Sequence, residues 1–164
     1  MTHPTGPAGA PSGPGGHRGF VVTARTSAPV DAVWPLLGEA RPWKEWTFLD
    51  RSELEREGAT DPDGVGAVRR FTRLGFGSRE EVVAWEPPSH LGYVMRSGFP
   101  VRNYRADVRL QPDGEGTAVS WSVRFDERVP LTGRLMEALL HRIVSGFARG
   151  LVRHTERASA SSPP

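Results

Sequence analysis

The chain has 164 residues, of which 37% are hydrophobic and 24% are charged, and its 21 basic and 19 acidic side chains leave a formal net charge of +2. These values fit one globular domain large enough to bury a core, and they argue against a dedicated nucleic-acid-binding protein, whose positive charge is larger and clustered. The absence of cysteine excludes disulfides, thiolate catalysis and cysteine-ligated zinc, and no apolar run reaches the ~18 residues that a membrane span needs.

Both ends of the chain have a composition typical of disorder. Residues 1–19, MTHPTGPAGAPSGPGGHRG, and residues 158–164 consist mainly of glycine, proline and small side chains. Such segments cannot bury enough apolar surface to offset the entropy lost on ordering. The N-terminal segment also lacks the apolar region of a secretory signal. We therefore expect a disordered arm and tail, a folded domain over residues 20–157, and a cytoplasmic location.

Between these ends the hydrophobic pattern changes three times. Residues 20–26, FVVTART, are rich in β-branched side chains and predict a strand, and residues 28–40 predict a short helix that Pro35 kinks or shortens. RPWKEW predicts a second helical turn. From residue 47 to 126 the chain reads as short strands joined by turns such as DPDG, GFG and PDGEG, which implies antiparallel neighbours.

After Pro130 the chain reads as one long amphipathic helix. Its expected apolar face carries Leu135, Met136, Leu139, Leu140, Ile143, Val144, Phe147 and Leu151. The whole pattern predicts an α+β helix-grip fold. In that fold a curved antiparallel sheet of about seven strands wraps around a long C-terminal helix, with two short helices between the first two strands.

Five segments carry a resemblance to a known family: TSAPVDAVWPLL, GVGAVRRF, EEVVAWEPPSHLGY, TAVSWSVRF and the closing helix. In these segments, which cover nearly all of residues 20–156, the chain resembles the SRPBCC or START-like superfamily, and within it the polyketide cyclase/dehydrase-type proteins. The resemblance implies a hydrophobic cavity between the sheet and the helix. It implies no single reaction, because the relatives include lipid carriers, chaperone activators and cyclases.

The segment DGVGAVRRF, residues 63–71, resembles half of a nucleotide-binding loop. A dinucleotide motif, however, needs a strand before its glycines, a helix after them and a third glycine. Here a turn precedes the glycines and a strand pattern follows them. We therefore expect Gly64 and Gly66 to let the chain turn into a strand.

The turn GFG sets the expected register of the next two strands. If Leu74 lies opposite Ser78, then Arg69 and Glu81 share the inner face and lie diagonally ~7–8 Å apart. A buried ion pair of this kind would point to a ligand or to catalysis, since it is costly to desolvate. A register slip of one residue is the alternative; it would leave both groups outside and turn Arg70 toward the interior.

Strand alternation and the helical pattern supply the other cavity candidates, for which plain core packing is the alternative. The full set of expected ligand-binding residues is Trp46, Arg69, Phe71, Glu81, Val83, Trp85, Tyr93, Met95, Tyr104, Trp121, Met136, Leu140 and Phe147. Trp43 and Trp46 are expected either to gate the cavity or to pack beneath it. Gly146 and Gly150 are expected either to leave room for a ligand or to let the helix approach closely.

The sequence thus favours binding of a small hydrophobic molecule, aromatic, lipid-like or polyketide-like, with Tyr and Trp groups as polar anchors. The second hypothesis is a cyclase, aromatase or dehydratase that needs no cofactor. In that case Arg69 would polarise a carbonyl and Glu81, Tyr93 or Tyr104 would move the proton. No histidine pair has ligand spacing with a carboxylate, so no metal is expected.

A third hypothesis is a protein-interaction module. Arg105, Arg109 and Arg124 fall on the expected outer face of the sheet, where they would meet an acidic partner. Asp107 interrupts this basic patch, and a solvated basic face is the alternative.

Overall fold

A computed structural model of the chain describes residues 17–161. Its elements, in chain order, are β1 (His17–Thr26), α1 (Val30–Gly38), α2 (Trp43–Trp46), β2 (Arg51–Arg56), β3 (Val68–Arg73), β4 (Phe76–Glu86), β5 (His90–Ser97), β6 (Val101–Asp113), β7 (Gly116–Glu127) and α3 (Gly133–Ser161). The seven strands form one sheet in the order β1-β7-β6-β5-β4-β3-β2, with every neighbouring pair antiparallel.

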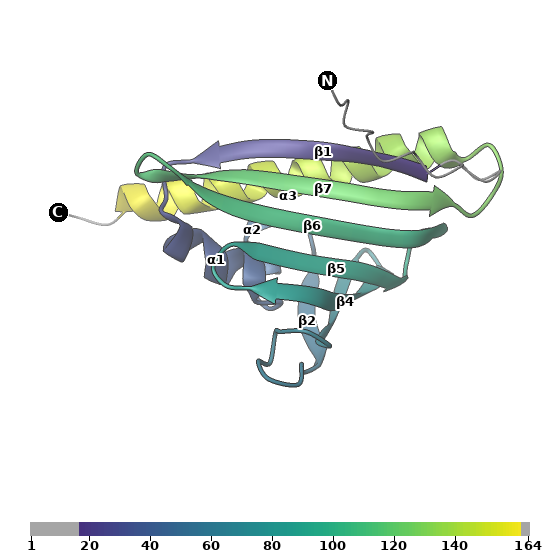
Figure 1. Ribbon diagram of the computed structural model, residues 1–164, viewed down its shortest axis with the longest axis horizontal. Coiled ribbons are helices and arrows are strands. Elements are labelled where there is room, and N and C mark those ends of the chain that lie inside the picture. Colours follow the sequence, from purple (N-terminus) through teal and green to yellow (C-terminus); the bar gives the residue numbers. More distant parts are fainter. Residues whose placement is uncertain (1–16, 162–164) are drawn as a thin grey trace, which may run out of the picture.

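The long helix α3 runs along one face of the sheet, behind β1 and β7 in Figure 1. The predicted helix-grip fold is therefore confirmed, including the two short helices between the first two strands. No helix within residues 17–161 is long and apolar enough to cross a membrane. The described strand and helix extend slightly beyond the expected limits of 20 and 157, and the rest of the expected arm and tail lies outside the described residues.

Strand alternation places the core as the sequence predicts for the two longest strands. On β6 and β7 every second side chain is buried on the face that α3 covers. These residues are Tyr104, Ala106, Val108, Leu110, Val119, Trp121, Val123 and Phe125. Because successive strand residues face opposite sides, their neighbours along the chain point away from α3.

The short helices are anchored to each other by indole hydrogen bonds. Trp43 Nε1 donates to the carbonyl oxygen of Leu37 at 2.9 Å, and Trp46 Nε1 donates to that of Leu36 at 3.0 Å. These carbonyls lie in the last turn of α1, where no intrahelical donor is available to them. Both tryptophans are buried, so packing accounts for them.

Gly64 and Gly66 have the geometric role expected of them. Gly64 closes a turn by accepting a hydrogen bond from the backbone N–H of Ala67 at 2.9 Å. Gly66 has a φ of 89°, in the left-handed region that favours glycine. Its N–H then donates to the carbonyl oxygen of Val82, which leads the chain directly into β3.

The predicted register of β3 and β4 is wrong by three residues. Leu74 and Gly75 form a two-residue turn with φ values of 49° and 81°, so that Arg73 lies opposite Phe76. A leucine at positive φ is uncommon, and the sequence therefore gave no sign of this tight hairpin. As a result Arg69 lies opposite Glu80 rather than Val83.

A bulge at Val83 restores the expected register farther along β4. The pairing shifts between Val82, which lies opposite Tyr93, and Ala84, which lies opposite Gly92. One extra residue on a strand reverses the alternation of its side chains. Trp85 consequently lies opposite Leu91, as the sequence predicts.

Two glycines of α3, Gly146 and Gly150, differ in how closely neighbouring residues approach the helix. A Cβ at Gly150 would collide with the backbone oxygen of Trp46, whereas a Cβ at Gly146 would meet only the ring of Phe48, at 3.3 Å. We expect Gly150→Ala to destabilise the protein by about 2–3 kcal/mol, because the backbone of α2 must move. Gly146→Ala should be neutral or slightly stabilising, since alanine favours the helix. Chemical denaturation of both variants checks this, and equal effects would contradict the close approach at Gly150.

Candidate functional site

A cavity of about 330 Å³ lies between α3 and the inner face of β3, β4, β5 and β6. Its lining is mainly apolar and consists of Phe48, Leu49, Phe71, Arg73, Leu74, Phe76, Ser78, Glu80, Tyr93, Met95, Phe99, Tyr104, Leu140, Ile143, Val144 and Phe147. Leu74 and Phe76 are exposed, at 85% and 52%, and they mark the mouth. The polar residues Glu80, Tyr93 and Tyr104 are buried, and they form the inner end.

The hydrogen bonds at the inner end run in one direction. Trp121 Nε1 donates to the Tyr93 hydroxyl oxygen at 3.1 Å. Indole nitrogen is only a donor, so Tyr93 accepts here and its own proton is free to serve Tyr104, with which it is hydrogen-bonded. Burial raises the pKa of both phenols, well above the usual range for Tyr93. Both tyrosines therefore keep their protons at neutral pH.

Glu80 brings a carboxyl group into this apolar cavity. Glu80 is 8% exposed, and no group of residues 17–161 forms a hydrogen bond or an ion pair with its carboxyl group. Burial raises the pKa of Glu80 to about 8, and the positive charge of Arg69 only partly offsets that rise. The carboxyl is thus largely protonated at neutral pH, and it can donate as well as accept.

Arg69 is fully buried but does not line the cavity. Its Nη2 donates to the carbonyl oxygens of Gly38 and, at 3.3 Å, of Asp63. Its Nε and Nη1 are buried without a hydrogen-bond partner in the described part of the chain. Burial lowers the pKa of Arg69, and the nearby carboxyl groups of Asp63 and Glu80 partly offset this decrease. The guanidinium nevertheless stays charged, as it does in proteins generally. Arg69 therefore ties β3 to the end of α1 and sets the charge beside Glu80.

The expected pairing of Arg69 with Glu81 is wrong. Glu81 points out of the sheet, where its Oε2 lies 2.8 Å from Arg96 Nε and 3.5 Å from Arg56 Nη2. These arginines lower the pKa of Glu81. Val83 is the extra residue of the bulge. The error of three residues in register, an odd number, had exchanged Glu80 and Glu81 between the two faces.

The structure brings six of the expected ligand-binding residues to the cavity wall: Phe71, Tyr93, Met95, Tyr104, Leu140 and Phe147. Five others belong to the surrounding core rather than to the wall: Trp46, Arg69, Trp85, Trp121 and Met136. Trp85 packs on Trp34, with ring centroids 5.0 Å apart. On α3, Leu135 and Leu139 are exposed at 65% and 37%, so the predicted apolar face is wider than the buried one.

Sequence reasoning missed the mouth of the cavity and Glu80. Phe48, Leu74, Phe76 and Phe99 come from turns and strand ends, where alternation gives no orientation. The signal for Glu80 was present in the dipeptide Glu80-Glu81, of which only one member can face inward. A two-residue turn at Leu74 and Gly75 gives the register in which Glu80 is the member that faces inward.

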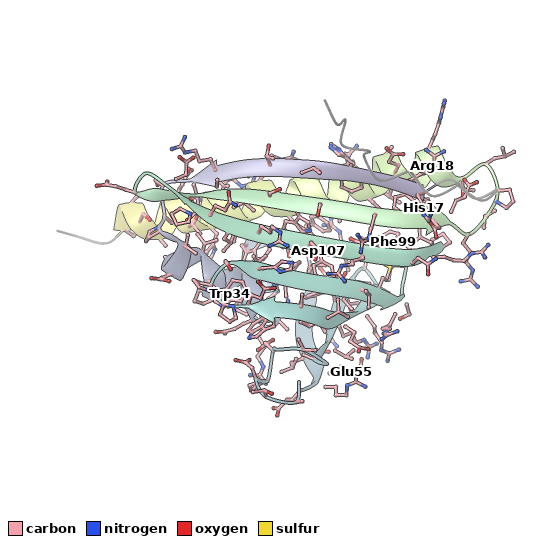
Figure 2. All side chains as sticks on the ribbon, in the orientation of Figure 1. His17, Arg18, Trp34, Glu55, Phe99 and Asp107 are labelled. Atoms are coloured by element: carbon pink, nitrogen blue, oxygen red, sulfur yellow. The ribbon has the colours of Figure 1, made fainter. Side chains whose placement is uncertain are left out.

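The outer face of the sheet carries a separate charged cluster, in which Asp107 projects away from α3 (Figure 2). Arg105 binds both carboxylate oxygens of Asp107 at 2.8 Å, and His90 Nε2 lies 2.9 Å from Asp107. Arg105 and His90 together hold the pKa of Asp107 at about 2. Arg105 is thus already paired within the chain. Within residues 17–161 no three His, Asp or Glu side chains gather as a metal site.

Comparison with known proteins connects this architecture to a family. The family model described as polyketide cyclase/dehydrase and lipid transport matches residues 17–158, which is most of the chain. The chain belongs to this family. Its fold is that of an SRPBCC or START-like, polyketide cyclase/dehydrase-type protein. A search of the curated proteins found no match.

Solved structures of similar fold agree with this assignment. The protein XoxI from Bacillus cereus is 20% identical, with a TM-score of 0.73 over 86% of this chain and 97% of its own. A START superfamily protein from Mycobacterium smegmatis is 11% identical, with a TM-score of 0.74 over 87% of this chain and 99% of its own. A protein from Nitrosospira multiformis is 18% identical, with a TM-score of 0.68 over 87% of this chain and 99% of its own. At these identities the likeness shows the fold alone.

Proposed function

We propose that the protein binds one small, largely apolar molecule in the cavity between α3 and the sheet. The observation that carries the proposal is the cavity wall, which is mainly apolar and has Glu80, Tyr93 and Tyr104 at its buried end and the polar side chains of Arg73 and Ser78 nearer to solvent. Ligand sites commonly combine an apolar lining with a few placed polar groups. The volume of about 330 Å³ lies at the small end of such sites, which favours a compact ligand.

The family supports the same proposal. Its description includes lipid transport, an activity that requires an apolar binding site. In this fold α3 runs along one face of the curved sheet (Figure 1), and residues of α3 and of the sheet together line the cavity.

A variant that fills the cavity tests this function. Ile143 lines the cavity on α3, and Ile143→Trp should lower the affinity for the neutral fluorescent probe N-phenylnaphthylamine at least about tenfold, since the larger side chain takes the ligand's space. Leu135→Trp is the matched control, because Leu135 lies on the same helix but is exposed and outside the cavity wall. Equal affinities in the two variants and the unaltered protein would contradict binding in this cavity.

The chemistry of the inner end supports a second function, proton transfer to a bound carbonyl compound. A buried protonated carboxyl beside tyrosine hydroxyls is suited to general acid–base catalysis. Incubation of the protein with a carbonyl probe such as acetylnaphthalene, followed by mass analysis of the released compound, separates the two functions. A binding protein releases a carbonyl probe unchanged, whereas a catalyst returns a compound of different mass or structure.

A further inference from the structure

The inner end of the cavity presents two hydrogen-bond donors that the fold leaves without an acceptor. We infer that the site selects apolar molecules carrying a neutral carbonyl oxygen, and that Glu80 and Tyr104 hold this oxygen at the buried end. The inference rests on the proposed function and names the ligand class of the same cavity.

The first donor is Tyr104. The chain of hydrogen bonds starts at Trp121 Nε1, which can only donate, passes through Tyr93, and ends at the Tyr104 oxygen. No group within residues 17–161 accepts the Tyr104 proton. Tyr104 is 5% exposed and lines the cavity, so this proton can serve only a group inside the cavity. An unused hydroxyl in such a place costs free energy unless a ligand accepts from it.

The second donor is Glu80. Its carboxyl lines the cavity, is more than nine-tenths buried and has no hydrogen-bond partner within residues 17–161. The charged or titratable groups that act on it are Arg69 from β3, Tyr93 from β5 and Tyr104 from β6. The facing residues of α3 that line the cavity are Leu140, Ile143, Val144 and Phe147, all apolar. In this setting the neutral carboxyl is favoured at neutral pH, and it donates its proton.

Two donors at the same end of the cavity favour a ligand group that can accept from both. A carbonyl oxygen has two lone pairs and meets this requirement. An ammonium group would need the ionised carboxyl and would lie near the Arg69 charge. A carboxylate would bring a buried charge into the apolar cavity, and Arg69, which does not line the cavity, is not placed to bind it.

The test compares a ketone with a hydrocarbon of nearly the same shape. Acetylnaphthalene and ethylnaphthalene, substituted at the same ring position, are titrated calorimetrically at about pH 6.5 and about pH 9.5, on either side of the Glu80 titration. We expect the unaltered protein to prefer the ketone about tenfold at the lower pH, and less at the higher pH. Glu80→Gln should keep a preference for the ketone that no longer depends on pH, because an amide always donates.

Glu80→Leu should keep only a smaller preference for the ketone, which no longer depends on pH, because Tyr104 remains as the one donor. The apolar side chain should leave the fold intact, since no group within residues 17–161 loses a hydrogen bond to the Glu80 carboxyl. Equal binding of the two probes by the unaltered protein would overturn the inference while the proposed function stands. A preference that still depends on pH in Glu80→Gln would also overturn it. Failure of both probes to bind would contradict the proposed function itself.

Discussion

Replacing Glu80 with glutamine is expected to stabilise the protein, and to do so far more at alkaline than at acid pH. The pKa of Glu80 is raised from 4.5 in the unfolded chain to about 8 in the folded protein, because the carboxyl is buried. Between these values the folded protein holds a proton that the unfolded chain releases. The free energy of unfolding of the unaltered protein therefore falls as pH rises through this window.

Glutamine does not titrate, so the stabilisation by Glu80→Gln should grow across the window and then level off above about pH 8. The increase between about pH 5 and about pH 9 should be on the order of 4 kcal/mol. Urea denaturation of both proteins at the two pH values measures it.

Glu81→Gln is the matched control for this prediction. Glu81 is the next residue on β4, but it faces outward and binds Arg96, which lowers its pKa. Its ionised form therefore contributes stability above its unfolded pKa, and the glutamine variant should lose about 0.5 kcal/mol there. A stability difference between Glu80→Gln and the unaltered protein that stays constant with pH would contradict a buried, protonated carboxyl at position 80.

Removal of the Arg69 side chain is expected to have the largest destabilising effect among the charged residues of the sheet. Arg69 donates to the carbonyl oxygens of Gly38 and Asp63, and it is the positive charge nearest to the buried Glu80. Truncation to alanine leaves these carbonyl oxygens without a hydrogen-bond donor, and it leaves an unfilled space in the core. We expect Arg69→Ala to lower the free energy of unfolding by about 3–5 kcal/mol.

Arg70→Ala separates this effect from a general effect of removing an arginine. Arg70 is adjacent on β3 but exposed on the other face, and its loss should change stability by less than about 0.5 kcal/mol. Guanidinium denaturation of the two variants provides the comparison. Similar small losses in both would show that Arg69 does not hold α1 and the turn at Asp63 to the sheet.

Regular elements could be predicted from the sequence because their patterns are long. Alternation over β6 and β7 placed Tyr104, Trp121 and Phe125 correctly inside. The periodicity of α3 likewise placed Leu140 and Phe147 beside the cavity. In each case many residues of one element report the same orientation, so a local irregularity changes little.

The carboxyl of the site could not be predicted, because its position depends on two irregular residues. Leu74 adopts a positive φ that leucine rarely adopts, and it shortens the expected turn by one residue. Val83 then adds one residue to β4 as a bulge. Between these two positions every side chain of β4 faces the side opposite to the expected one, which moves Glu80 inward and Glu81 outward.

The most direct test of the account is an NMR titration of the protein with acetylnaphthalene, with amide and methyl signals followed residue by residue. The account predicts shifts at cavity-wall residues such as Tyr104, Ile143 and Val144, and their loss in the cavity-filling variant Ile143→Trp. Shifts confined to the exposed Leu131 and Leu135, or no shifts at all, would contradict a binding site between α3 and the sheet.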